Sequence, residues 1–312
     1  MKKLIILSLG LFLSTSLLFT SCKKSNTDST ENTTESQVHS DDQSLMADNN
    51  DEMSSDATTS AENVMAMTGR PQLPWFPDPC NSTVTYDTLN AIRTVTITYH
   101  GLNCNGTRSR TGVITISIPA GVLWRNAGAQ LTITYNALKI TRVRDGKSIT
   151  VNGVAKVTNV SGGLIRNLPA GGPAVTHAIT STGMSITFDN ASQRTWQIAK
   201  QRVFSFSSGI VITTTGTYTD GTTTGISEWG TNRFGNAFVT QIVDPMVIRQ
   251  SCFWRLTSGH IRHSRMIRTV DVTFGLDASG NPTTCPGQTA AYYLKAVWVN
   301  YQGNTITVIL PY

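Results

Sequence analysis

Titratable side chains are scarce in this chain. Asp, Glu, Lys and Arg make up 14% of it, and Glu228 is the only glutamate from Pro79 onward. An enzyme needs such groups brought together in one site, so this scarcity argues against a catalytic domain. The chain also lacks a P-loop, a dinucleotide-binding fingerprint and a Gly-x-Ser-x-Gly turn. These absences exclude the enzyme classes built on those motifs, and no cofactor is expected.

Long hydrophobic runs are missing except at the start of the chain. Two lysines precede an apolar run from Leu4 to Phe19, and Ser21 and Cys22 follow shortly after it. The run is short for a membrane span, and this order is typical of a lipoprotein signal peptide. We therefore predict that residues 1–21 are removed and that Cys22 carries acyl chains such as palmitate. An ordinary secretory signal or a single transmembrane anchor is the alternative.

Lipidation of Cys22 would anchor the protein to a membrane of the cell envelope. The outer membrane is the expected one, and the sequence does not choose between its periplasmic and surface faces. Residues 22–70 have no aromatic side chain and consist largely of Ser, Thr, Asn, Asp and Glu. Such a segment buries too little apolar surface to fold, so we predict a disordered acidic tether. As a flexible coil, this tether would span roughly 40 Å.

The two signs of charge are unevenly distributed. Eleven of the 19 Asp and Glu lie in residues 23–78 and eight lie beyond, where there are also twenty Lys and Arg. Residues 71–312 are therefore predicted to form a single basic domain. Its expected partners are anionic: acidic polysaccharide, another envelope protein or the acidic tether itself. Specific nucleic-acid binding is not expected, because the domain has no block of consecutive Lys or Arg.

Four cysteines lie beyond Cys22, and they are Cys80, Cys104, Cys252 and Cys285. Four cysteines allow three pairings, and the sequence alone does not decide among them. Cys80 and Cys104 bracket two predicted strands, as do Cys252 and Cys285, so we favour these two pairs. Disulfides suit an oxidising compartment. A metal site is disfavoured, because no Cys-x-x-Cys pair or adjacent histidine occurs.

Thr or Ser alternates with Val, Ile, Tyr or Phe in short runs from Ser82 onward, and Gly, Asn and Asp separate the runs. This pattern predicts an all-β domain, either an antiparallel sandwich or a partly closed barrel of roughly 12–15 strands, stapled by two disulfides. In one run the alternation places Val95, Ile97 and Tyr99 on a single face. The similar run Ile267–Phe274 repeats this arrangement. We therefore expect one buried and one solvated face on the sheet.

Several short motifs resemble a family of uncharacterised all-β cell-envelope lipoproteins of Gram-negative bacteria. The motifs are Cys80, a Thr-Val-Thr-Ile strand, Cys104, Gly153–Asn159, Gly230–Gly235 and Cys252–Gly259. The resemblance covers roughly Cys80 to Asn300. The chain departs from the family pattern after Cys285, where Pro286 replaces the start of the usual Cys-Asp-Asn motif. The resemblance implies a fold class and a compartment, and it brings no catalytic residues.

The densest polar cluster is a candidate anion-binding site, in which arginines would bind sulfate, phosphate or uronate groups. Its members are His260, Arg262, His263, Arg265 and Arg268. The alternative is a hairpin from Gly259 to Phe274 whose turn is simply solvated. Zinc is not expected, because no third ligand is near and histidines three apart in a strand point to opposite faces.

Two functional hypotheses follow from these observations. The first is a membrane-anchored envelope lipoprotein whose non-catalytic β domain binds a partner or an anionic glycan. The alternative is a carbohydrate-active or other hydrolase, for which Glu228 and Asp244 are the conceivable carboxylate pair. A deep pocket that brought Glu228 and an aspartate together would favour the hydrolase.

Overall fold

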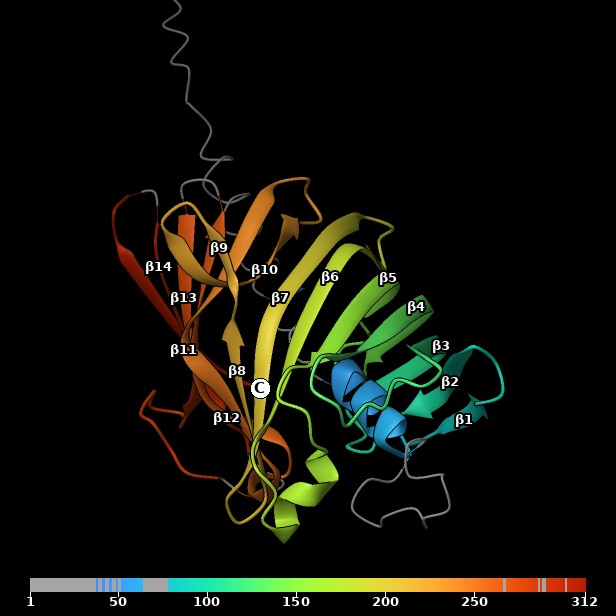
Figure 1. Cartoon of the computed structure of the whole chain (residues 1–312). Helices are drawn as coiled ribbons and strands as arrows, with labels where there is room; N and C mark the ends of the chain where they lie inside the picture. The colour runs from blue at the N-terminus through green and yellow to red at the C-terminus, as the bar shows by residue number, and fades with distance from the viewer. Residues whose placement is uncertain are drawn as a thin grey trace, which may run out of the picture.

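Fifteen antiparallel strands form one sheet in the described part of the chain (Figure 1). The computed structural model describes residues 38, 41–42, 45–46, 49, 52–63, 78–265, 268–285, 287, 290–300 and 302–312. The strands are β1 (Ser82–Asp87), β2 (Ile92–Leu102), β3 (Arg108–Pro119), β4 (Ala129–Arg142), β5 (Ser148–Asn159), β6 (Val175–Phe188), β7 (Gln193–Phe206), β8 (Ile210–Gly216), β9 (Tyr218–Asp220), β10 (Thr223–Thr231), β11 (Ala237–Arg249), β12 (Arg255–Arg265), β13 (Arg268–Leu276), β14 (Tyr293–Val299) and β15 (Thr305–Pro311). Two 3-10 helices, η1 (Ile165–Ala170) and η2 (Gln250–Cys252), complete these elements.

Most strands pair with their neighbours in the sequence. The spatial order runs from β1 to β7 and then from β10 to β15, while β8 pairs with both β7 and β11 and β9 pairs with β10. All the strands of the described residues thus belong to a single sheet, not to two stacked ones. The predicted all-β antiparallel fold is confirmed, and so are both favoured disulfides, Cys80–Cys104 and Cys252–Cys285. Cys22 and the predicted signal peptide lie outside the described residues.

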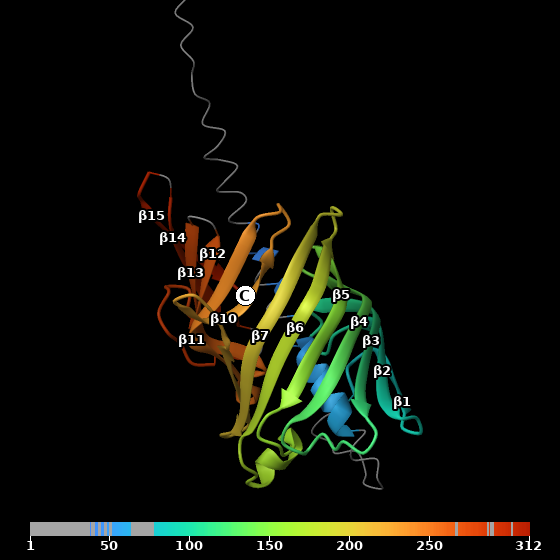
Figure 2. The same cartoon turned by 45° about the horizontal axis from the view of Figure 1, so that its top comes forward.

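The alternation of apolar and polar residues along a strand determines which face of the sheet is buried. Val95, Ile97 and Tyr99 of β2 are buried, as predicted, while the threonines between them are partly exposed. Val272 and Phe274 of β13 are buried in the same way. The buried face is the concave one, because its residues pack against the helix that lies inside the curve of the sheet (Figures 1 and 2). Among the described residues no helix is long and apolar enough to cross a membrane.

A row of β-bulges crosses strands β3 to β6 of the sheet. The register shifts near Gly112 in β3, Ala137 in β4, Gly153 in β5 and Gly183 in β6, and these positions lie side by side across the strands. Each bulge adds one residue to a strand and increases its local bend and twist. Gly112 and Gly153 have positive φ angles of 116° and 125°, which other residues rarely adopt. The curvature of the sheet therefore depends on bulges at adjacent glycines and at one alanine whose backbone is in the left-handed conformation.

Replacing Gly153 with alanine should lower the free energy of unfolding by about 2–3 kcal/mol. A Cβ atom at Gly153 would lie 2.8 Å from the backbone Cα of Met184, at a φ of 125°. Gly146→Ala is the matched control, because Gly146 also has a positive φ but has no atom within 4 Å of the added Cβ. The control should lose only about 1 kcal/mol in denaturant unfolding. Equal losses would show that close packing at the bulge is unimportant.

Residues 52–63 form a helix against the concave face of the sheet, drawn in blue in Figures 1 and 2. Met53, Ala57 and Ala61 are buried in the same hydrophobic cluster as Ile97 and Ile133 of the sheet. The prediction of a disordered tether through residue 70 was therefore wrong for residues 52–63, and also for the described residues between 38 and 49, which are helical as well. The physical reason is the spacing of Met53, Ala57 and Ala61: one apolar residue every four positions makes a stripe on a helix. The sheet supplies the apolar surface that the segment lacks.

Three hydrophobic clusters fill the described core. The largest lies between the helix and β2 to β7, the second covers β11 to β14, and the third joins η1 to β6, β7 and β8. Several buried residues on β7, β10, β11 and β12 are polar or charged. They include Lys200, Glu228, Thr240 and His263. We call these four residues the polar seam, and they form part of the candidate site.

Candidate functional site

Cationic side chains occupy inward positions of the sheet. Buried cations stand on β3, β4 and β7, and they are Arg110, Arg142, Arg194, Lys200 and Arg202. A cation removed from water is costly unless anions or hydrogen-bond acceptors surround it. The acidic N-terminal segment supplies many of the carboxylates that meet this need.

Helix 52–63 binds the cations of β3. Asp56 accepts a hydrogen bond from Arg110 at 2.7 Å and another from the Tyr99 hydroxyl at 2.8 Å. Glu52 lies 3.3 Å from both Arg108 and Arg110. Burial raises the pKa of Asp56 to about 6, although the charge of Arg110 opposes the rise. The guanidinium of Arg110 also lies over the Tyr99 ring, so the helix and two strands share one network.

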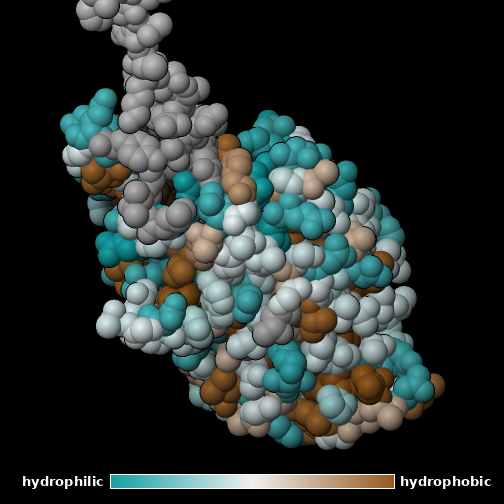
Figure 3. Space-filling model, turned by 90° about the horizontal axis from the view of Figure 1, so that it is seen from above, coloured by the Kyte–Doolittle hydropathy of each residue, from teal (hydrophilic) through white to brown (hydrophobic). Residues whose placement is uncertain are grey.

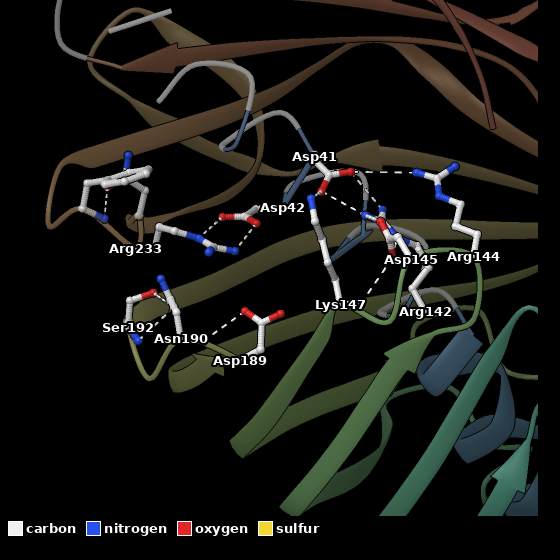
Figure 4. Close-up of polar contacts among 12 residues, drawn as sticks. Asp41, Asp42, Arg142, Arg144, Asp145, Lys147, Asp189, Asn190, Ser192 and Arg233 are labelled. Carbon is white, nitrogen blue, oxygen red and sulfur yellow. Dashed lines mark hydrogen bonds and ion pairs between the residues drawn. The ribbon is translucent and has the colours of Figure 1, made fainter. Parts of the chain in front are cut away.

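Asp41 and Asp42 hold the segment to one end of the sheet (Figure 4). Asp41 accepts hydrogen bonds at 2.9 Å from Arg142 and from Lys147. Asp42 accepts two from Arg233, at 2.8 and 2.6 Å, in the forked geometry that suits a carboxylate. We call these five residues the clamp. It joins the β4–β5 and β10–β11 turns through the N-terminal segment.

The two clamp carboxylates have opposite pKa shifts. Burial raises the pKa of Asp41, but hydrogen bonds from Arg142 and Lys147 outweigh burial and leave this pKa below its ordinary value. For Asp42, burial dominates over Arg233, and the pKa is raised. The Asp41 carboxylate is therefore firmly ionised at neutral pH.

Glu62 holds the other end of the helix. Its carboxylate accepts hydrogen bonds from the backbone N–H of Ile165 at 2.7 Å and of Arg166 at 3.2 Å, at the start of η1. Burial raises the pKa of Glu62 to about 7, and the two N–H groups only partly offset the rise. The acidic segment is thus fixed both at the clamp and at η1.

The polar seam contains a buried ion pair. Lys200 of β7 and Glu228 of β10 are joined at 2.5 Å, with side chains only 5% and 1% exposed, and the indole N–H of Trp196 donates to Glu228 at 3.1 Å. Beside this pair, His263 is hydrogen-bonded to Thr240 at 2.9 Å. Burial lowers the pKa of His263 to about 4, so its imidazole is neutral at neutral pH.

The five residues of the predicted anion cluster do not gather at one point. His260 and Arg262 lie on the outer side of β12, where both contact Asp271 at 2.9 Å. His263 is buried on the opposite side, as the spacing predicted. Arg265 ends β12 and Arg268 begins β13, and the side chain of Arg268 is not among those described. Asp271 supplies a carboxylate to this cluster from within the chain, and anion binding there stays a prediction.

Glu228 and Asp244 are not brought together by the fold. Glu228 pairs with Thr240 in the β10–β11 register, and Asp244 lies four residues further along β11, roughly 13 Å away. The Asp244 side chain is 71% exposed and contacts His260 at 3.4 Å. In the described residues, no three His, Cys, Asp or Glu side chains are grouped so as to hold a metal ion. The geometry therefore gives no support to Glu228 and Asp244 as a catalytic pair.

The inner-face cations were not among the sequence-based candidates. Arg110, Arg194 and Arg202 could have been recognised from their positions in the sequence. Each stands on the inward side of an alternating strand, where an aliphatic residue is expected. No family model matches the chain, and no curated protein or solved structure is significantly similar to it. The resemblance to the lipoprotein family therefore stays a prediction from short motifs. The function has to be argued from the chemistry of the cations and their carboxylate partners.

Proposed function

We propose that this protein is a lipid-anchored lipoprotein of the cell envelope, in the outer membrane, whose non-catalytic β domain binds an acidic glycan. The observation that carries the proposal is the clamp, where cations of the sheet bind carboxylates of the chain's own acidic segment. Uronate groups of an acidic polysaccharide present the same carboxylates, and arginine binds them in the same forked geometry. The excess of Lys and Arg over Asp and Glu beyond residue 78 supports the same ligand class.

The proposed site consists of the three clamp cations, Arg142, Lys147 and Arg233, together with Arg144, which lies 3.8 Å from Asp41. Arg144 and Lys147 are 59% and 53% exposed, so a ligand in solution can reach them. Arg142 and Arg233 are more buried, and an acidic glycan would compete there with Asp41 and Asp42. Seen from above, the molecule shows mostly hydrophilic and intermediate residues, with smaller hydrophobic groups between them (Figure 3).

Binding of the full chain to uronate-rich polysaccharides on a glycan array should weaken as salt is added, because exposed charge contacts are screened. The variant Arg144→Gln/Lys147→Gln should bind roughly tenfold more weakly, since it removes two exposed cations. Lys139→Gln/Lys156→Gln is the matched control, because these lysines are exposed on the outward face of β4 and β5. Binding that ignores salt, or an equal loss in the control, would contradict the proposal. Binding to an acidic envelope protein alone would replace the glycan with a protein partner.

A further inference from the structure

The clamp lies at one end of the sheet and Glu62 at the other. Consecutive strands of a meander reverse direction, so alternate turns fall at opposite ends. Arg142 and Arg233 stand at the β4–β5 and β10–β11 turns, which share one end, here called the clamp end. Glu62 binds η1, which lies in the β5–β6 connection at the opposite end, called the far end. The acidic segment therefore crosses the inner face from the clamp end to the far end.

The position of the clamp limits how far its end can lie from the lipid anchor. Asp41 follows Cys22 by nineteen residues. A chain of that length reaches at most about 65 Å when fully extended, and as a flexible coil it spans roughly 25 Å. The far end lies a further 40 Å or so away, because β5 has 12 residues at about 3.3 Å each. A free tether through residue 70 would place no such restriction on either end.

We infer that the clamp orients the domain, with the clamp end facing the bilayer that holds Cys22 and the far end directed away from it. The inference rests on the lipidation of Cys22 in the proposed function. Three ion-pair contacts carry it: Asp41 with Arg142 and with Lys147, and Asp42 with Arg233. Because of these contacts, the connection between Cys22 and the domain ends at the clamp and not at residue 70. The clamp cations then face the lipid head groups, and the acidic glycan is bound close to the membrane surface.

Fluorescent labels at the two ends of β5 test the orientation. Val143 precedes β5 at the clamp end and Val160 follows it at the far end, and the two side chains are 54% and 49% exposed. Each is replaced by cysteine in turn and labelled in the full, lipidated protein on phosphatidylcholine vesicles. Energy transfer to acceptor-labelled head groups should be roughly twofold or more higher from position 143, because about 40 Å separates the two ends. Equal transfer from both positions, or higher transfer from position 160, would overturn the orientation.

A clamp variant separates the effect of the clamp from that of the anchor. Asp41→Asn/Asp42→Asn removes the charges of the ion pairs and leaves Met53, Ala57 and Ala61 to hold the helix. The difference in energy transfer between the two labels should shrink in this variant. A difference that persists unchanged would show that the clamp does not orient the domain. Wild-type protein that fails to float with the vesicles would refute lipidation, and with it the proposed anchoring, as a separate outcome.

Discussion

Replacing Lys200 with methionine is expected to lower the free energy of unfolding by about 3–5 kcal/mol. Lys200 and Glu228 are only 5% and 1% exposed, so the substitution removes the lysine charge that balances a carboxylate in the interior. Methionine keeps much of the aliphatic stem of lysine, and the loss therefore reports charge more than volume. Denaturant unfolding of the two proteins measures the difference.

Lys147→Met provides the control for this prediction. Lys147 also lies 2.9 Å from a carboxylate, that of Asp41, but its side chain is 53% exposed. Exposed ion pairs contribute roughly 0–1 kcal/mol, so this variant should lose little stability. The double variant Lys200→Met/Glu228→Gln should recover part of the loss, because the carboxylate charge is gone. A Lys200→Met protein as stable as the Lys147→Met protein would show that the seam tolerates Glu228 without the charge of Lys200.

The stability of Glu62→Gln relative to the wild type should rise by roughly 3 kcal/mol as the pH increases from 4 to 8. The pKa of Glu62 is raised from 4.5 to about 7, so between these values the folded protein holds a proton that the unfolded chain releases. Raising the pH across this window therefore destabilises the wild type. Glutamine does not titrate, and its variant escapes the loss. Denaturant unfolding at several pH values measures the difference.

Comparing Glu62→Gln with the wild type separates the effect of Glu62 on stability from the effects of the other buried titratable groups. The raised pKa of Asp56, about 6, acts in the same direction. Burial lowers the pKa of His177 to about 3 and that of His263 to about 4, so these two groups make stability rise with pH below about 6.5. All three are common to both proteins and cancel in the difference. A difference that stays constant from pH 4 to 8 would show that Glu62 is not buried at η1.

The strands were predictable because the dry face of the sheet imposes a period of two on the sequence. Val95, Ile97 and Tyr99 showed this period directly, and the opposite orientation of His260 and His263 followed from the same rule. The arrangement of the strands in one curved sheet did not follow. Curvature depends on bulges at Gly112 and Gly153, and alternation alone does not reveal whether a glycine bends a strand or merely ends it.

The helix and the clamp were missed for a different reason. Composition predicts disorder for residues 52–63, because Ser and Thr dominate and few apolar residues occur. The spacing of Met53, Ala57 and Ala61 was the available signal for a helix. The partners of that helix lie far along the chain: Asp42 binds Arg233, 191 residues away. A single sequence does not show such pairings, although the opposite charges of the two parts make them favourable.

That separation has a consequence for how the protein folds. Neighbouring strands of the meander are close in the sequence, so their hairpins can form early in folding. The acidic segment is synthesised before any strand, yet Arg233 must be present before Asp42 can bind it. The acidic segment is first in the sequence, yet its native contacts are thus among the last to form. Until β10 and β11 are in place, the concave face of the growing sheet stays uncovered at the clamp.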